Sequence, residues 1–334
     1  VAAWQRPETI VVHEPFWTPM AKRADIVLPA TTPLERNDLG GAETMLIAMQ
    51  QAIAPHAEAR NDYEIYAGLA DRLGFGEQFT DGRSADEWVE HLYEQFADAN
   101  DYAPSFDEFW STGFVEHDMA VMGDTDQVFL ADFRADPDAT PIPTPSGRIE
   151  LFSETIAGFG YDDCGGHPMW FEPFERLGTT KAEQWPLHLI SNQPRTRLHS
   201  QYDHGPPSRA AKVADREPVR LNPADAAARS ISAGDVVRIH NDRGACLAGA
   251  VLSDAVSSGV VELATGAWYD PDVDGTCKHG NPNVLTADKG TSKLAQGPSA
   301  QTCLVEVERY DGEPPPVTAF DPPSFVREDE NAAG

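Results

Sequence analysis

The chain has 334 residues, of which 41% are hydrophobic, and its 54 acidic residues against 25 basic ones give a net charge of −29. This length suits about two domains with a sizeable core. The charge disfavours nucleic acid as a partner, because phosphate binding needs a basic face, and no apolar run approaches the ~18 residues of a membrane-spanning helix.

The surface is expected to be acidic and poor in lysine, since only 6 of the 25 basic residues are lysine. Such a surface is well solvated and self-repelling. A saline habitat and the base composition of the genome would both produce it, and the sequence leaves these two explanations open.

The cysteines lie far apart in the sequence, at Cys164, Cys246, Cys277 and Cys303. No CxxC pair occurs, so the spacing indicates neither zinc nor an iron–sulfur cluster. Two disulfides are possible, but buried thiols are the simpler expectation.

The first residues, VAAWQRPETIVVHE, lack the basic start, long apolar stretch and cleavage site of a secretory signal. They are more typical of a helix end, a proline turn and a strand at residues 9–13. A short helix at 18–23 and a strand at 26–28 should follow, which together predict a parallel α/β unit. A chain that opens in this way is expected to be a piece of a longer protein.

Three helices should follow, each with a recognisable N-terminal cap before an apolar stripe. Their capping residues are Asn61, Ser84 with Glu87, and Ser105 with Glu108. Gly74 and Gly113 mark two of the helix ends. Residues 116–146 are polar and rich in proline, which is typical of a long connection, and a strand is expected at 148–152.

From about residue 183 the pattern changes to short strands, expected at 187–191, 236–240, 245–252, 260–263 and 303–308. A tight turn at 241–244 separates two of them, and one short helix is expected at 223–229. This half is therefore predicted to be a β-barrel-like domain. The tail from 313 to 334 is rich in proline and acidic residues, and its last residues should be disordered.

Three residues of the first half could contact a ligand. Glu14 ends the first predicted strand, where nucleotides bind in open α/β sheets. Arg36, in an ERND sequence after the second strand, could pair with a phosphate. Asp62, in the first turn of its helix, could accept hydrogen bonds from a guanine edge. Considered alone, each is better explained by a surface or capping role, and no GxGxxG loop supports an ordinary NAD site.

The segment 191–201 (SNQPRTRLHSQ) is a loop dense in amide, guanidinium and hydroxyl groups. Ordering it would be costly without a polar ligand, so a binding role is favoured. Residues 278–286 and 290–302 are similar. No nucleophile–base pair stands out, and His13, His199 and His279 lack the spacing of metal ligands.

Several segments taken together resemble the dimethyl-sulfoxide reductase family of molybdenum enzymes. They are HEPFWTPMAKRADIVLPATTPLERND (13–38), EARNDYEIY (58–66), TPSGRIELFS (144–153), RLHSQ (197–201), NPADAAARSISAGDVVRIHNDRG (222–244), GAWYDP (266–271) and GTSKLAQG (290–297). Within the family the chain is most similar to reductases of biotin sulfoxide, trimethylamine N-oxide and dimethyl sulfoxide. The matching segments run in order from about residue 9 to residue 310.

The resemblance implies a molybdenum bis(molybdopterin guanine dinucleotide) cofactor. Residues 1–182 would form part of the α/β cofactor domain, with a helical insertion and a linker, and residues 183–312 a double-psi β-barrel. Family cofactor contacts fall on Glu14, Arg36, Asp62, Asn192, Gln193, Arg197, His199, Ser200, Asn283 and Gln301.

The family's metal ligand, a serine, lies in an N-terminal half that this sequence lacks, so no residue here is assigned as catalytic or as a metal ligand. The chain is expected to be an inactive C-terminal part of an enzyme that transfers an oxygen atom from an S-oxide or N-oxide and draws on an electron donor. Alternatives are a non-catalytic cofactor-binding barrel and a relative of formate dehydrogenase or nitrate reductase. Relatives of the biotin sulfoxide type are cytoplasmic and the others usually periplasmic, so the compartment stays open.

Overall fold

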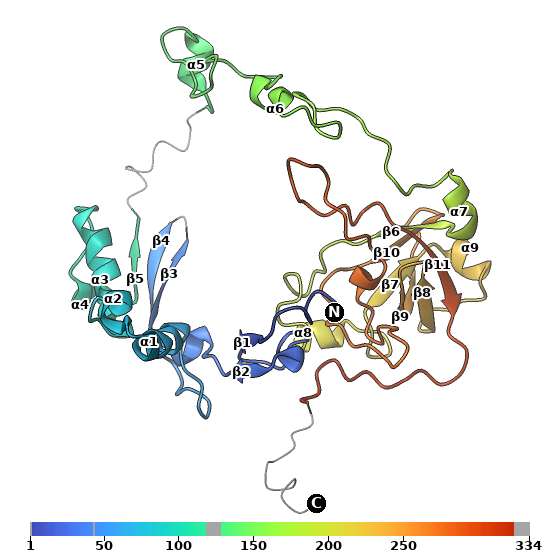
Figure 1. Cartoon of the computed structure of the whole chain (residues 1–334), viewed down its shortest axis with the longest axis horizontal. Helices are drawn as coiled ribbons and strands as arrows, with labels where there is room; N and C mark the ends of the chain where they lie inside the picture. Colours follow the sequence, from blue (N-terminus) through green and yellow to red (C-terminus); the bar gives the residue numbers. More distant parts are fainter. Residues whose placement is uncertain (1, 43, 118–127, 324–334) are drawn as a thin grey trace, which may run out of the picture. The chain divides into compact units, whose positions relative to one another are not determined.

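The computed structural model describes residues 2–42, 44–117 and 128–323. The chain divides into two units, Val1–Arg148 and Ile149–Gly334 (Figure 1). The sequence predicted a boundary between residues 182 and 183. In the structure, residues 149–182 belong to the second unit instead. One reason is Glu175, which is buried and bonded to Arg243 and to the backbone N–H of Leu304 in the second unit.

The first unit contains the predicted parallel pair of strands. Strand β1 (Val11–His13) pairs with β2 (Ile26–Leu28), and Val12 lies opposite Val27. The connecting helix is shorter than predicted. Helix η1 (Ala21–Arg23) is a single 3-10 turn, and Thr18 accepts a hydrogen bond from the backbone of Ala21 at 3.3 Å.

A second sheet in the first unit was not predicted. Strands β3 (Asp38–Ala42), β4 (Met45–Met49) and β5 (Phe114–Glu116) are antiparallel, in the order β3-β4-β5. Helix η2 (Pro33–Glu35) precedes this sheet. Its apolar cluster joins the sheet to helices α3 and α4, because Ala48 and Val115 pack with Tyr93 and Phe109. The rings of Tyr93 and Phe109 stack with centroids 4.2 Å apart.

The helices form where the capping residues predict them. They are α1 (Asp62–Leu73), α3 (Ala85–Asp98) and α4 (Phe106–Thr112). A further short helix, α2 (Gly76–Thr80), was not predicted, and no side chain caps its N-terminus. Asn61, Ser84 and Ser105 accept hydrogen bonds from backbone N–H groups three residues later. Gly74 and Gly113 end α1 and α4 with φ values of 85° and 92°, which glycine adopts without strain.

The strand expected at 148–152 does not form. These residues are all described and lie in bends and extended chain. A strand needs a partner for its backbone groups, and no described segment pairs with them. Three short helices, α5 (Ala131–Ala135), α6 (Glu154–Gly158) and α7 (Thr180–Gln184), lie in this part of the chain, and 118–127 lie outside the described residues.

The second unit contains a closed six-stranded barrel, which agrees with the predicted β-barrel-like domain; five of its strands were predicted, and β7 was not. Its strands are β6 (Leu187–Ile190), β7 (Pro218–Leu221), β8 (Val236–His240), β9 (Ala245–Leu252), β10 (Val260–Leu263) and β11 (Leu304–Arg309). Around the barrel their order is β10-β6-β11-β8-β9-β7. The pairs β6–β10 and β7–β9 are parallel and the others antiparallel. Helices α8 (Pro206–Ala210), α9 (Pro223–Ala227) and η3 (Pro282–Val284) lie in the connections.

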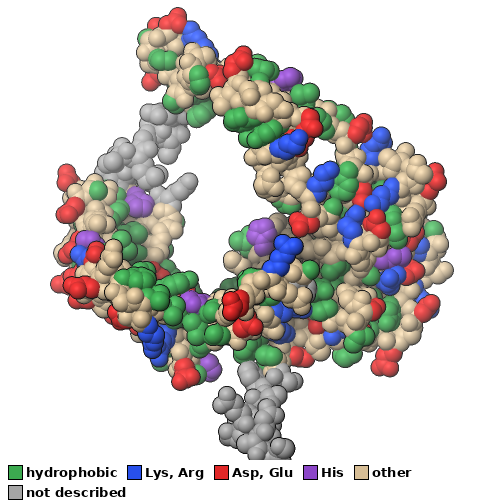
Figure 2. All heavy atoms as spheres, viewed as in Figure 1, with side chains coloured by type: hydrophobic (Ala, Val, Ile, Leu, Met, Phe, Trp, Pro, Cys, Tyr) green, Lys and Arg blue, Asp and Glu red, His purple; other side chains and the backbone are tan. Residues whose placement is uncertain are grey.

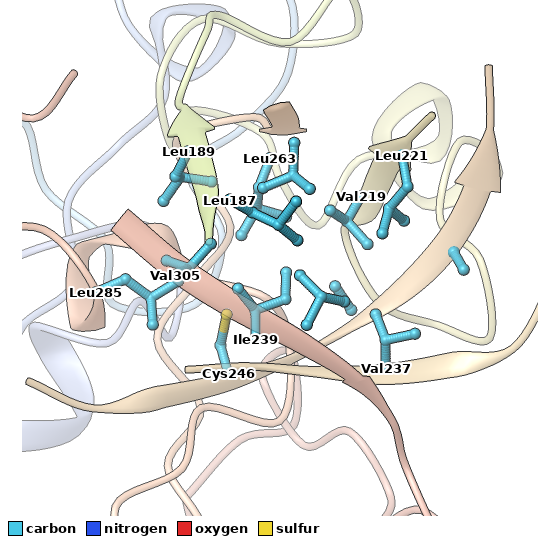
Figure 3. Close-up of a cluster of buried hydrophobic side chains, with 14 of the residues drawn as sticks. Leu187, Leu189, Val219, Leu221, Val237, Ile239, Cys246, Leu263, Leu285 and Val305 are labelled. Carbon is cyan, nitrogen blue, oxygen red and sulfur yellow. The ribbon is translucent and has the colours of Figure 1, made fainter. Parts of the chain in front are cut away.

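Alternate side chains of the strands fill the barrel (Figure 3). Leu189, Val219 and Ile239 have no exposed surface. Cys246, Cys277 and Cys303 are buried free thiols, which confirms the expectation for these three, and Cys164 is free and half-buried. Burial raises the pKa of Cys303 to about 11, so this thiol is a core group rather than a reactive one.

The first residues of the predicted tail are held by the barrel unit. The backbone N–H and the hydroxyl of Thr318 each donate to the carboxylate of Asp270 at 2.7 Å. Ala319 is buried, and the ring of Phe320 contacts Trp268 and His279. Residues 324–334, for which disorder was expected, lie outside the described residues.

No helix in the described part of the chain is long and apolar enough to cross a membrane. Acidic side chains are spread over both units (Figure 2), in line with the net charge of −29.

Candidate functional site

Glu14 lies immediately after β1, as predicted. Its backbone N–H donates to the carbonyl of Leu28 at 3.2 Å, and its carboxylate accepts from the hydroxyl of Thr18 at 3.3 Å. Burial raises the pKa of Glu14. No cation forms an ion pair with it among the described residues, so this carboxylate keeps acceptor capacity for a neutral donor.

Asp62 is close to the end of the same strand. Its carboxylate lies 3.0 Å from Nδ1 of His13, the residue before Glu14, and its side chain is 61% exposed. The ring of His13 also contacts Tyr66, one turn along α1. The parallel pair and the N-terminus of α1 thus place Glu14 and Asp62 in one region.

Arg36 follows helix η2 and faces the same groove as Asp62. Its Nε donates to Asp38 at 3.1 Å and its Nη1 to the carbonyl of Thr31 at 2.9 Å. A surface groove of about 270 Å³ is lined by Arg36, Asp38, Asp62 and Trp88, among others. Two of the three residues that the sequence singles out in this unit therefore share one groove.

Glu35 was not singled out, yet it organises the loop beside Arg36. Its side chain is buried and accepts from the backbone and hydroxyl of Thr32, at 2.7 and 2.8 Å, and from the backbone of His56 at 2.7 Å. These hydrogen bonds lower the pKa of Glu35. The Thr32–Glu35 spacing is that of a capping box, which is the signal that could have identified it.

In the second unit, the polar loop that follows β6 is held by its own side chains. The amide oxygen of Gln193 accepts from the backbone N–H of His199 at 3.1 Å, and its Nε2 lies 2.8 Å from Nδ1 of that imidazole. Asn192 donates to Glu262 on β10 at 2.9 Å. Asn192, Gln193, His199 and Ser200 are all exposed.

Gln301 lies against this loop. Its amide group pairs with both backbone groups of Ser191, accepting from the N–H at 3.2 Å and donating to the carbonyl at 2.8 Å. The carbonyl of Ser200 accepts from the indole N–H of Trp268 at 2.8 Å. Asn283 is exposed on η3, and no hydrogen bond joins it to the loop within the described segments.

Arg197 differs from its neighbours because its side chain turns inward and is only 1% exposed. The guanidinium lies 3.0 Å from Glu217 and 3.4 Å from Asp203. Lys212 also pairs with both carboxylates, at 2.7 Å to Asp203 and 2.6 Å to Glu217. We call Arg197, Asp203, Lys212 and Glu217 the buried charge cluster; it contains two cations and two carboxylates.

His279 adjoins the buried charge cluster and has no exposed surface. Its Nδ1 lies 3.0 Å from the carbonyl of Trp268, and its Nε2 has no hydrogen-bond partner in the described structure. Burial, and then the nearby charge of Lys212, lower the pKa of His279 to about 4.

The buried charge cluster holds Asp203 ionised, since Lys212 and Arg197 outweigh the effect of burial and lower the pKa of Asp203. Of these residues, only Arg197 was predicted to have a binding role, because the others join it only in the fold.

No group of three or more potential metal ligands lies close together within the described ranges. The predicted site residues themselves are hydrogen-bonding groups: carboxylates and a guanidinium in the first unit, and amides and an imidazole in the second.

Comparisons with known proteins support a relationship along the whole chain. A family model described as "Molybdopterin oxidoreductase" matches residues 1–72, and one described as "Molydopterin dinucleotide binding domain" matches residues 187–304. The dimethyl sulfoxide/trimethylamine N-oxide reductase of Cereibacter sphaeroides is 47% identical over 96% of this chain and 40% of its own length. The biotin sulfoxide reductase of the same organism is 48% identical over 93% and 42%.

The trimethylamine-N-oxide reductase of Haemophilus influenzae is 46% identical, over 98% of this chain and 41% of its own length. The chain thus spans about 40% of the length of these relatives. Among solved structures, acetylene hydratase from Pelobacter acetylenicus matches 92% of the chain with a TM-score of 0.71 and 20% identity. That likeness shows a shared fold.

Proposed function

Because the chain belongs to the molybdopterin oxidoreductase family, we propose that it is the C-terminal part of an S-oxide or N-oxide reductase and that its two units bind the molybdopterin guanine dinucleotide cofactor. The bound cofactor would supply the oxygen-atom and electron transfer. The residues of this chain would bind and orient it, and the remaining part of the enzyme would supply the metal ligand.

The loop after β6 carries this proposal. Asn192, Gln193 and His199 stand exposed in a loop whose backbone is already fixed by Gln301 and by the Gln193–His199 pair. Amide and imidazole groups can both donate and accept, which suits the edge of a pterin or a guanine. A loop fixed before binding loses little conformational entropy when the ligand arrives.

The first unit offers complementary groups. Glu14 is a half-buried carboxylate with no cation paired to it in the described part of the chain, and ribose hydroxyls are the neutral donors that would suit it. Asp62 is mostly exposed at the N-terminus of α1 and can accept from a guanine edge. Arg36 lines the same groove and can reach a phosphate. The residues of both units therefore fit the implied cofactor.

The barrel topology supports a finer assignment. Two parallel pairings, β6–β10 and β7–β9, occur within an otherwise antiparallel closed barrel. We propose that this is the double-psi arrangement. We also propose that the full enzyme holds two guanine dinucleotides around one molybdenum, and that Asn283 and Ser200 contribute contacts from the barrel side.

The proposal is tested in the full-length enzyme with Arg36→Ala and Asp62→Ala. Each removes a charged hydrogen bond of about 1.5–3 kcal/mol. Molybdenum and guanine content per folded protein should therefore fall together. Reduction of trimethylamine N-oxide, dimethyl sulfoxide and biotin sulfoxide should be assayed in parallel to identify the substrate.

Matched controls are Arg134→Ala and Asp132→Ala on α5, which remove the same charges away from the groove. These controls should keep full molybdenum and guanine content. If Arg36→Ala and Asp62→Ala also keep both, the assignment of the first-unit residues is wrong.

A further inference from the structure

The side chain of Arg197 is already saturated within the barrel unit. Its Nε donates to the carbonyl of His199 at 3.1 Å and its Nη1 to the hydroxyl of Ser208 at 3.0 Å. Its Nη2 donates to Glu217 at 3.0 Å and to the carbonyl of Thr265 at 2.9 Å. With five N–H donors in a guanidinium and 1% of the side chain exposed, little capacity is left for a ligand.

The charge around Arg197 also disfavours a phosphate. The two cations of the buried charge cluster are balanced by Asp203 and Glu217, which lie within 3.4 Å of the Arg197 guanidinium. A phosphate at this guanidinium would enter beside two buried carboxylates, and like charges at short range repel strongly in a buried environment. A direct ion pair with the cofactor is therefore unfavourable.

The contacts of Arg197 join two loops instead. It binds the carbonyl of His199 in the loop after β6 and the carbonyl of Thr265 after β10. The backbone N–H of Thr265 in turn donates to the carbonyl of Asn192 at 2.9 Å. The loops approach so closely that a Cβ on Gly266 would lie 1.7 Å from the carbonyl oxygen of His199.

We propose that Arg197 is a positioning residue: it fixes the loop of residues 192–201 from beneath so that Asn192, Gln193 and His199 face the cofactor, and it does not itself bind phosphate. This inference rests on the proposed function for the identity of the ligand. The placement of Arg197 under the loop rests only on the structure. Arg195, two residues earlier, is exposed and forms no ion pair within the described segments.

Hydrogen exchange of the 334-residue chain without cofactor tests the proposal. Arg197→Gln removes the bonds to both loops, and Arg197→Lys keeps the charge but lacks the planar set of donors. Lys212→Met is the matched control, because it removes one positive charge from the same cluster. Among the described residues its amine donates to Asp203 and Glu217 and not to the carbonyls of either loop. Arg195→Gln controls for charge in the loop itself.

Both Arg197 variants should speed exchange in residues 192–201 and at Thr265 by about tenfold or more, relative to the barrel strands, because charged hydrogen bonds that hold these loops are lost. Lys212→Met and Arg195→Gln should leave that ratio unchanged. Equal effects of Lys212→Met and the Arg197 variants would overturn the proposal, since Arg197 would then act only through the stability of the cluster. Unchanged loop exchange in both Arg197 variants would overturn it as well.

The result is independent of cofactor binding. If the full-length enzyme contained no guanine nucleotide, the proposed function would fail while the exchange pattern could still place Arg197 beneath the loop. In the full-length enzyme, Arg197→Lys should lower guanine content and Arg195→Gln should not. If Arg197→Lys retained full guanine content while loop exchange rose, the positioning of the loop would be irrelevant to binding and the inference would be wrong.

Discussion

Replacing His279 with glutamine should make the unfolding free energy of the barrel unit less dependent on pH between 4 and 6.5. The imidazole has no exposed surface, and its pKa is about 4. In the unfolded chain the ordinary value of about 6.5 applies. Between these values the unfolded state binds a proton that the folded state does not, so the unfolding free energy falls as the pH drops.

The gap between 6.5 and about 4, at about 1.4 kcal/mol per pH unit, corresponds to roughly 3 kcal/mol. The charged groups that face the ring are Lys212, Asp203 and Asp270; the first disfavours the imidazolium and the other two favour it. The pKa of about 4 for His279 already includes the effects of these three charges. Glutamine cannot take up a proton, but its amide can still donate to the carbonyl of Trp268.

Urea unfolding at several pH values between 4 and 7.5, followed by near-ultraviolet circular dichroism, measures this difference. The wild-type chain should lose about 3 kcal/mol more than His279→Gln on going from pH 6.5 to 4. His167→Gln replaces an exposed histidine of the same unit and should behave like the wild type. If the curves of wild type and His279→Gln ran parallel over this range, His279 would not be held neutral by burial.

The 334-residue chain alone should not reduce trimethylamine N-oxide or a sulfoxide, and measurable turnover by the purified chain would contradict its being part of a larger active site. Gly266→Ala should cost at least ~1–3 kcal/mol, since its φ is +92° and the new Cβ would meet the carbonyl oxygen of His199. Gly275→Ala, with a φ of +87° but open space around it, should show only the backbone penalty. Thermal unfolding of both glycine variants measures this difference in stability. Thr318→Val removes the hydroxyl bond to Asp270 and should lower stability by about 1–3 kcal/mol, and an unchanged Tm would show that this contact contributes nothing.

Local signals predicted much of the fold. Asn61 and Gly74 delimit α1 because capping and left-handed backbone are decided within a few residues. Strands β8, β9 and β10 have the predicted bounds since their apolar residues recur in short runs between turns. The barrel-like character of the second half could therefore be anticipated from the sequence, although one of its six strands could not.

Elements that depend on distant partners could not be predicted in this way. Strand β3 contains two adjacent glycines, Gly40 and Gly41, and becomes a strand by pairing with β4. Strand β7 begins with Pro218, which weakens its strand signal. Both segments become strands because they pair with strands that the local sequence does not reveal.

The candidate site also has a part that could be predicted from the sequence and a part that could not. The density of polar side chains singled out the loop of residues 191–201, whose Asn192 and Gln193 are exposed, and its binding role stays a prediction. The inward turn of Arg197 could not be foreseen, because its partner Glu217 lies 20 residues further along the chain. A motif indicates which residues belong to a loop; which of them face outward depends on the packing beneath it.

The order of strands in the barrel also has a consequence for how the protein is made. Strand β6, the first of the barrel in the sequence, lies between β10 and β11, the last two. Only β8 and β9 can pair as a local hairpin during synthesis, so the barrel has many contacts between distant residues and should fold slowly. Until residues 304–309 have been synthesised, β6 and β8 each keep an open edge that can pair with another chain.

The loop that we propose to hold the dinucleotide follows β6, and its backbone is fixed by Gln301, just before β11. On that proposal, cofactor insertion on this side should come after synthesis of the barrel.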